Sequence, residues 1–257
     1  GDYKDSKQCK RPIFTDGPLQ CFEDKGYASK KEIHFSGDIM HNKFFIVDHQ
    51  FVWTGSTNIS DTGIGGYNAN LAAEIDSKAI ASIYTEEFNQ MYEFDLYHKE
   101  KFKLQKDQIK TKINQSTISL FFSPQNYAMD EGVIRLIDEA EESINVTIFF
   151  LTHNELSKAL VEAKKRGVFV RVILDATAAT NGYSKHNYLR ENGIPLKVES
   201  WGGKMHMKAA TVDQKHIIMG SMNWTAAGGS KNDENTLIVR NDYKNVKLMN
   251  NFFDKLW

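Results

Sequence analysis

The chain has few cysteines, and this scarcity narrows the range of metal sites. Only Cys9 and Cys21 occur among its 257 residues. A cysteine-based zinc site usually takes four such ligands or a CxxC pair, and neither is present. The two thiols are compatible with a reduced pair or with one local disulfide, so they leave the compartment open.

Other features that are scarce or absent bound the class of protein. Four prolines and no low-complexity stretch argue against long disordered regions. No apolar run approaches the roughly 18 residues that suggest a transmembrane helix, and the polar N-terminus lacks a signal-peptide core. The net charge of −1 gives no global attraction for a polyanion, although a local basic groove stays compatible with it.

What the chain does contain is an internal repeat. The segment "MHNKFFIVDHQFVWTGSTNIS" begins at Met40, and "MHMKAATVDQKHIIMGSMNWT" begins at Met205. Six polar or glycine identities occur at a constant offset of 165 positions, which excludes a chance match. The pairs are His41 and His206, Lys43 and Lys208, Asp48 and Asp213, Gly55 and Gly220, Ser56 and Ser221, and Asn58 and Asn223.

The repeat continues downstream. Residues 67–75, "YNANLAAEI", parallel residues 231–239, "KNDENTLIV", and a one-residue slip aligns Asn70 with Glu234. Each copy then ends in an aromatic-rich amphipathic segment, 83–94 and 246–257, whose apolar spacing predicts a helix packed on a core.

The pattern around the second copy predicts an α/β fold. Strands are expected at 117–123, 144–151 and 168–175, helices at 130–143 and 154–167, and a strand pair at 209–213 and 215–220. We therefore predict two lobes related by a pseudo-two-fold axis, each a mixed, mostly parallel sheet flanked by helices. Nothing in residues 1–40 resembles the strand–helix–strand start of the second copy, so the first lobe is expected to be N-terminally incomplete.

The predicted domains are a partial first lobe at 1–97, a linker at 98–116 and a second lobe at 117–257. Residues 98–112 are rich in lysine and lack a clear apolar face. We interpret them as a solvated linker, with a polyanion-contacting strip as the alternative.

The spacing within each copy favours phosphodiester chemistry. Residues i and i+2 of a strand share a face, so His41 projects with Lys43, and Ser56 with Asn58. Lysines and amide donors stabilise charge on phosphate oxygens. One neutral histidine can attack phosphorus, while a second, protonated histidine gives its proton to the leaving oxygen.

Both copies fit HxKxxxxD followed by GSxN, and the sequence resembles a two-motif member of the phospholipase D superfamily over about residues 34–95 and 117–257. The resemblance implies metal-independent phosphodiester cleavage through a phosphohistidine, with no cofactor. The form "GSMNWT" resembles the nuclease and mitochondrial cardiolipin hydrolase branches more than the cardiolipin synthases.

The resemblance also implies roles for individual residues. It favours His41 as nucleophile and His206 as acid/base, and it implies that Glu234 orients His41, whereas Asn70 replaces the corresponding acid. Asp48 and Asp213, though part of the motif, are expected to be structural. The phosphate-binding set consists of Lys43, Lys208, Ser56, Asn58, Ser221 and Asn223.

Alternatives remain for the site and the substrate. A metal site is disfavoured because each histidine has a lysine two residues away. Trp53 and Trp224 are expected in the core rather than stacked on bases. An endonuclease is the leading prediction and a phospholipase the second, so the partner is nucleic acid or phospholipid. A pseudoenzyme that binds polyanions or lipids is the third prediction. The oligomeric state is open, and one option is that a second chain completes the first lobe.

Overall fold

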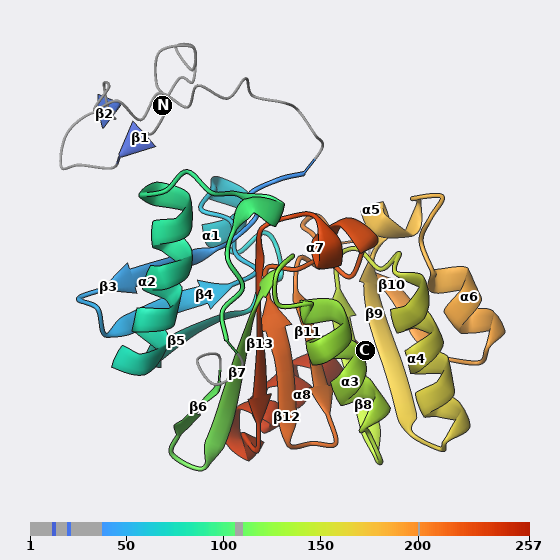
Figure 1. Cartoon of the computed structure of the whole chain (residues 1–257). Coiled ribbons are helices and arrows are strands. Elements are labelled where there is room, and N and C mark those ends of the chain that lie inside the picture. The colour runs from blue at the N-terminus through green and yellow to red at the C-terminus, as the bar shows by residue number, and fades with distance from the viewer. Residues whose placement is uncertain (1–11, 14–19, 22–37, 106–109, 200) are drawn as a thin grey trace. The chain divides into compact units, whose positions relative to one another are not determined.

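The computed structural model describes residues 12–13, 20–21, 38–105, 110–199 and 201–257 (Figure 1). The chain divides into two compact units, Gly1–Gly37 and Asp38–Trp257. In the first unit, β1 (Pro12–Ile13) pairs antiparallel with β2 (Gln20–Cys21). Cys9 and the predicted incomplete start of the first lobe lie outside the described residues. Both motif copies belong to the second unit.

The second unit is built around one large sheet. Its strands follow the order β10-β9-β8-β11-β12-β13-β7-β6. Their bounds are β6 Lys110–Ile113, β7 Ser116–Ser123, β8 Ser143–Ile148, β9 Phe169–Asp175, β10 Leu196–Glu199, β11 Lys208–Val212, β12 His216–Gly220 and β13 Glu234–Arg240.

The predicted mixed α/β sheet is confirmed, but its share of parallel pairing was overestimated. Within this sheet the parallel pairs are β8 with β9 and β9 with β10. Helices connect these strands along the chain. The other neighbours pair antiparallel, because the motif hairpin β11–β12 and the strands beside it are joined by turns and long returns. The sequence pattern of alternating strands and helices holds only at one end of the sheet.

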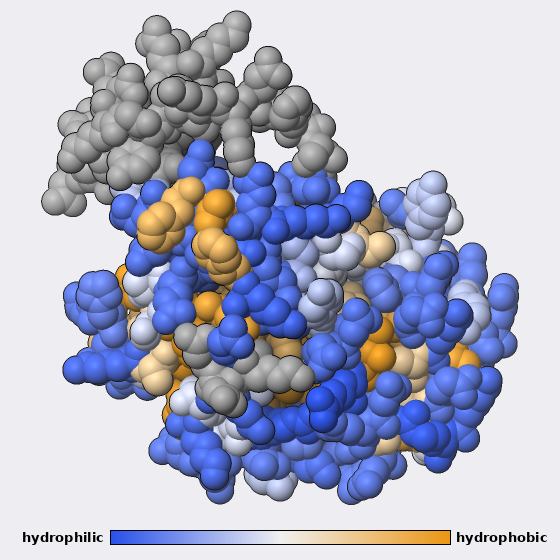
Figure 2. All heavy atoms as spheres, in the orientation of Figure 1, coloured by the Kyte–Doolittle hydropathy of each residue, from blue (hydrophilic) through white to orange (hydrophobic). Residues whose placement is uncertain are grey.

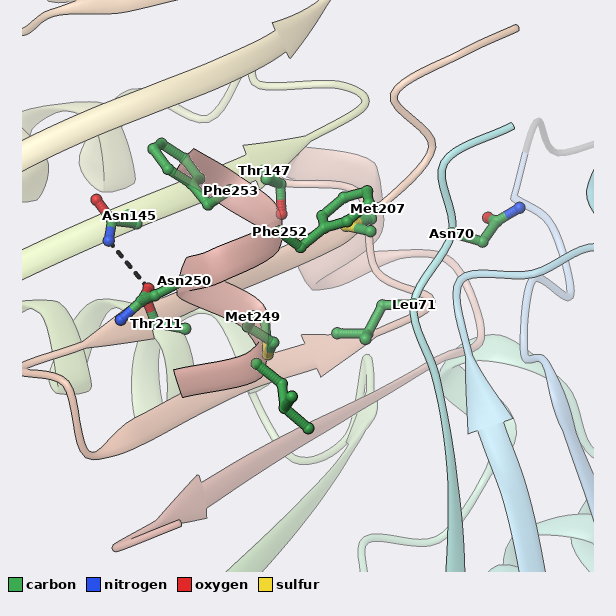
Figure 3. Close-up of a pocket in the computed structure, with 11 residues that line it drawn as sticks. Asn70, Leu71, Asn145, Thr147, Met207, Thr211, Met249, Asn250, Phe252 and Phe253 are labelled. Atoms are coloured by element: carbon green, nitrogen blue, oxygen red, sulfur yellow. Dashed lines mark hydrogen bonds between the residues drawn. The ribbon is translucent and has the colours of Figure 1, made fainter. Parts of the chain in front are cut away.

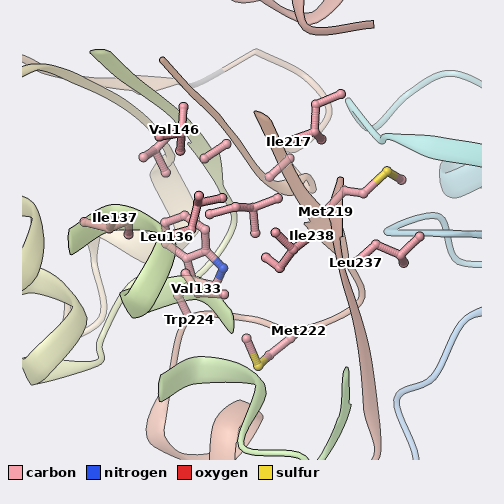
Figure 4. Packing of buried hydrophobic residues seen from close by; sticks show 14 of the residues in the cluster. Val133, Leu136, Ile137, Val146, Ile217, Met219, Met222, Trp224, Leu237 and Ile238 are labelled. Atoms are coloured by element: carbon pink, nitrogen blue, oxygen red, sulfur yellow. The ribbon is translucent and has the colours of Figure 1, made fainter. Parts of the chain in front are cut away.

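Helices cover both faces of this sheet. In Figure 1 the π-helical segment η3 (Ala128–Ile134), α3 (Arg135–Asp138) and α4 (Asn154–Lys165) lie in front of it, and α8 (Tyr243–Leu256) lies behind. Shorter helices are α5 (Ala176–Ala179), α6 (His186–Glu191) and α7 (Ala226–Ser230). Val133, Leu136, Val146, Ile238 and Trp224 pack together between the sheet and the front helices (Figure 4).

The helix α4 shows how the local sequence specifies these elements. His153 caps its start, because the ring Nδ1 accepts a hydrogen bond from the backbone N–H of Leu156. Leu156, Leu160 and Ala163 recur on one face and are buried. Gly167, at φ +97°, follows the last turn, where a residue with a side chain would be strained.

The first motif copy forms a separate three-stranded antiparallel sheet. It contains β3 (Phe44–Val47), β4 (Phe51–Gly55) and β5 (Ala72–Asp76) in that order. The short helix α1 (Asp61–Ile64) follows β4, and α2 (Lys78–Tyr92) packs on β3 and β4. Alternate residues face away from α2, and Phe45 and Val47 are therefore about half exposed, at 48% and 51%.

The segment between the two copies differs from its prediction. It contains the 3₁₀ turn η2 (His98–Glu100) and the edge strand β6, and the side chain of Lys101 is fully buried. A solvated linker is therefore wrong at Lys101, whose buried ion pairs hold it in place. The domain boundaries at 97 and 116 stay a prediction.

The visible face of the molecule is mostly hydrophilic, with hydrophobic residues in small separate patches (Figure 2). In the described part of the chain, no helix combines the length and apolar character that crossing a membrane requires.

Candidate active site

Two equivalent hairpins present the motif histidines. Asp48 and His49 turn the chain between β3 and β4 with φ of 54° and 51°, and Asp213 and Gln214 do the same between β11 and β12 with φ of 51° and 54°. These consecutive positive φ values are typical of the two-residue turns that join twisted antiparallel strands. The hairpins therefore place His41 and His206 just before equivalent strands.

The glycine of each GSxN segment permits a close backbone contact. Gly55 and Gly220 have φ of +154° and +155°. A Cβ atom at either glycine would lie 2.1 Å from a carbonyl oxygen, that of Leu71 or of Asn235. Because this space is free, the next backbone N–H groups, of Ser56 and Ser221, donate to the same two oxygens at 2.9 Å.

Each histidine segment is joined by its backbone to the opposite copy. The N–H of His41 donates to Asp233 O at 2.9 Å, and the N–H of Asp233 donates to Ile39 O at 3.0 Å. In the same way His206 N–H donates to Ala69 O at 2.9 Å, and Ala69 N–H donates to Lys204 O at 2.8 Å. The residue after each bridge, Glu234 or Asn70, is thereby held beside the histidine of the other copy.

The ring of His41 faces a buried carboxylate. Its Nδ1 lies 2.8 and 2.9 Å from the two carboxylate oxygens of Glu234, a residue with no exposed surface. Ser221 Oγ donates to the same carboxylate at 2.6 Å, and Asn232 Nδ2 donates to it at 3.3 Å. An ionised carboxylate only accepts, so Nδ1 carries a proton and the carboxylate compensates the charge of a protonated ring.

Within the described part of the chain, the hydrogen-bond partners of the His206 ring are neutral acceptors. Its Nδ1 lies 3.0 Å from Asn70 Oδ1 and 3.1 Å from the backbone oxygen of Ser56. Ser56 Oγ donates to Asn70 Oδ1 at 3.0 Å. Both ring partners accept through oxygen, so Nδ1 again carries the proton and Nε2 keeps its lone pair.

The surroundings of His206 keep its ring neutral. Burial, followed by the positive charges of Lys208, Lys43 and His41, lowers the pKa of His206 to about 3. The ring of Phe149 packs beside it, with centroids 4.9 Å apart. These charges act on His206 because the structure brings both histidines and both lysines into one site. Phe149 belongs to no motif, and its place in a buried strand gave no signal of this contact.

The two lysines are equivalent in contact but differ in burial. Lys43 Nζ donates to His41 O at 2.9 Å, and Lys208 Nζ donates to His206 O at 2.7 Å. Burial lowers the pKa of Lys43 to about 8, against an opposing effect of the Glu234 charge. Burial, followed by repulsion from Lys43, lowers the pKa of Lys208 well below its usual value. Each ammonium keeps further N–H donors for an anion.

The two motif aspartates differ. Asp213 is buried, and its carboxylate accepts from the backbone N–H groups of Glu141, Glu142 and Ser143 at 2.7–3.1 Å. Asp48 is exposed, and no hydrogen bond of its carboxylate is seen within the described ranges. Asp213 therefore makes the contacts expected of a structural residue, whereas no such contact is seen for Asp48.

The GSxN side chains fall into two groups. The hydroxyls of Ser56 and Ser221 are buried and donate to Asn70 and Glu234, so their geometry favours orientation of the histidine partners over the predicted phosphate contact. Asn58 is exposed and lines a pocket with His41 and Lys43. Asn223 is half-buried, and among the described residues its buried Oδ1 has no hydrogen-bond partner. Asn58 is therefore the more accessible of the two asparagines.

The pocket at His41 is lined by polar and apolar residues together. Its volume is about 310 Å³, and the lining includes Met40, Phe45, Trp53 and Ile59 beside His41. Met40 and Ile59 are 53% and 58% exposed. The predicted core position is wrong for Trp53, because this face of the three-stranded sheet is open, and is confirmed for Trp224, which is 1% exposed.

A second cavity lies on the His206 side. It has a volume of about 240 Å³ and is bounded mainly by α8, with Leu71, Met207, Met249 and Phe252 among its lining residues (Figure 3). Asn70 lies at its edge, so the residue that orients His206 borders an apolar space.

The geometry agrees with the comparisons to known proteins. Residues 6–92 and 133–257 match the family model described as "Cardiolipin synthase, PLD-like domain". The chain belongs to the phospholipase D superfamily. Its relatives include proteins named phospholipase D and cardiolipin hydrolase, and the prediction of a hydrolase of the phosphodiesterase type is confirmed.

Individual relatives within the superfamily carry different names. A phospholipase D of Rickettsia conorii is 29% identical over 145 residues, which are 56% of this chain and 72% of that protein. A mitochondrial cardiolipin hydrolase of Mus musculus is 34% identical over 134 residues, 52% of this chain and 60% of that protein. The structure of Nuc from Salmonella typhimurium, a phospholipase D family member, has a TM-score of 0.51 at 30% identity and covers 55% of this chain and 93% of that one.

Proposed function

We propose that the chain cleaves phosphodiesters without a metal ion, through a phosphohistidine on His206 and with His41 as acid and base. One observation carries the proposal. The two motif histidines and the two motif lysines share a site, and the Nδ1 atom of each histidine contacts a side-chain oxygen from the opposite copy of the motif.

The assignment of roles reverses the one that the family resemblance favours. A nucleophile needs a free lone pair, and His206 has a pKa lowered to about 3 and only neutral partners. An acid needs a protonated ring, and Glu234 supplies the negative charge that stabilises it at His41. The roles of the two histidines therefore differ because His41 has the carboxylate of Glu234 as its partner, whereas His206 has the neutral amide of Asn70.

The reaction then has two balanced steps. Nε2 of His206 attacks phosphorus and forms the N–P bond, the P–O bond to the leaving group breaks, and His41 gives its Nε2 proton to the leaving oxygen. Water next attacks phosphorus, His41 takes up the water proton, and the N–P bond breaks. Lys43, Lys208, Asn58 and Asn223 hold the non-bridging oxygens throughout.

The exposed apolar side chains at the pocket favour a phospholipid as the substrate. Met40, Phe45 and Ile59 are exposed apolar side chains next to His41, and a lipid diester carries its apolar chains close to the phosphate. The sequence relatives named phospholipase D and cardiolipin hydrolase agree with this choice. The nuclease predicted from the sequence becomes the second candidate, supported by the likeness to Nuc.

The test measures turnover of a phospholipid and of single- and double-stranded nucleic acid in EDTA. We expect lipid headgroup release that survives chelation and is lost in His41→Ala and His206→Ala. Mass spectrometry after an alkaline quench should find the covalent phosphoryl adduct on the peptide containing His206. The control is His49→Asn, an exposed histidine in the first hairpin turn.

The outcomes separate the candidates. Cleavage of nucleic acid alone would replace the lipid proposal with the nuclease. An adduct on His41 would reverse the assigned roles. Binding without turnover of either substrate would favour the pseudoenzyme.

A further inference from the structure

A buried ionic cluster lies next to the bridge that carries His41. Lys101 Nζ contacts three acceptors: it pairs with Glu87 of α2, lies 2.9 Å from Asp233 Oδ1, and donates to Ser123 O at 3.3 Å. The side chain of Lys101 has no exposed surface, and an ammonium has three N–H donors, so each donor has an acceptor.

The same cluster determines the position of Asp233. The Asp233 carboxylate, also fully buried, accepts from the backbone N–H of His98 at 2.8 Å. The His98 ring Nδ1 lies 2.9 Å from its second oxygen. The backbone of Asp233 meanwhile accepts from His41 N–H, and the next residue is Glu234. Lys101 therefore contacts the residue that places both the backbone of His41 and its carboxylate partner.

The second copy shows that the backbone bridge alone does not need these charges. Ala69 occupies the place of Asp233 and makes the same two backbone hydrogen bonds around His206. An aliphatic side chain is thus sufficient there. A buried carboxylate next to Glu234 is costly unless a cation is paired with it, so its presence on the His41 side alone points to a task connected with that histidine.

We propose that Lys101 is a positioning residue for acid catalysis. By holding Asp233, it keeps the Glu234 carboxylate and the backbone of His41 in the positions that the ring of His41 requires. The inference rests on the proposed function, in which His41 protonates the leaving group. Lys101 lies in a lysine-rich stretch without a motif, so no local pattern distinguishes it from exposed neighbours such as Lys99.

The test separates acid catalysis from folding by changing the leaving group. Bis(4-nitrophenyl) phosphate releases a weakly basic phenolate that needs little protonation, whereas dihexanoyl-phosphatidylcholine releases an alkoxide that needs a proton. In Lys101→Met we expect kcat/KM to fall about tenfold or more for the lipid and less than about threefold for the aryl diester. Lys99→Met, at an exposed lysine of the same segment, should change neither.

A second variant keeps the inference testable if Lys101→Met does not fold. Asp233→Asn retains the shape and the backbone bridge but removes the charge that attracts Lys101, and it should give the same selective loss at a smaller factor. An equal fall for both substrates, or no fall, in folded variants would overturn the inference. Absence of activity in the unaltered protein would contradict the proposed function, and with it this inference.

Discussion

The Nδ1 atom of His41 lies 2.8 Å from a carboxylate oxygen of Glu234, although 193 positions separate the two residues in the chain. The mirror contact joins His206 to Asn70 at 3.0 Å. Each copy of the motif therefore supplies the ring of one pair and the acceptor of the other. The site forms only when both copies are folded together.

Glu234→Gln should impair the step that needs a protonated His41. Glutamine can still accept from Nδ1 but cannot compensate the ring charge, so we expect kcat for an alkyl diester to fall by about 100-fold or more. Steady-state kinetics on a lipid diester measure this. Glu86→Gln, an exposed change on α2, is the control, and equal rates in the two variants would contradict the proposed role of Glu234.

Asn70→Asp should move the acidic limb of the pH profile to higher pH. A carboxylate at this position raises the pKa of His206 from about 3, so more of the nucleophile is protonated at pH 5 and less of it can attack. We expect kcat/KM to fall at low pH and to approach the unaltered value near pH 8. The exposed change Asn192→Asp should leave the profile in place. An unshifted limb in Asn70→Asp would count against His206 as nucleophile.

Binding of a diester should weaken as pH rises through about 8. Lys43 is cationic below that pKa and neutral above it, while a phosphodiester keeps one negative charge throughout. Calorimetry on His206→Ala, which binds without attacking, should show about a threefold or greater rise in Kd between pH 7 and 9.5. Adding Lys43→Arg should flatten this dependence because arginine stays charged. Parallel curves for both proteins would exclude Lys43 as the titrating group.

The two motif aspartates should differ in their effect on stability. Asp213→Asn weakens three backbone contacts of a buried carboxylate, and we expect the free energy of unfolding to fall by about 1–3 kcal/mol. Asp48→Asn, an exposed change that keeps the positive φ acceptable, should stay within about 0.5 kcal/mol. Urea unfolding measures both, and a similar loss in the two variants would show that Asp48 has a structural role of its own.

The sequence repeat predicts the chemistry of the site because its residues act through short, regular spacing. His41 and Lys43 are two apart just before β3, so their proximity follows from the backbone. The same expectation is wrong for Ser56 and Asn58, because they lie beyond the end of β4, where Ser56 is buried against Asn70 and Asn58 is exposed. The pairing of Glu234 with His41 came from the family resemblance, and the 2.8 Å contact between the two side chains agrees with it.

The contacts that the sequence did not predict depend on long-range packing. The burial of Lys101 requires that a lysine-rich segment pass between α2 and the start of β13, which no local pattern encodes. The partial exposure of Trp53 depends on which elements cover the three-stranded sheet. The balance of parallel and antiparallel pairs depends on the route of the returns between strands, which periodicity does not describe.

The paired backbone bridges, His41 to Asp233 and His206 to Ala69, have a consequence for dissecting the protein. A cut in the stretch from 98 to 116 would give one fragment with His41 and Asn70 and another with His206 and Glu234. Neither fragment would hold a complete pair of ring and acceptor, so separate expression should yield inactive halves. Catalysis would return only when the two fragments reassociate, so the recovered activity would measure their association.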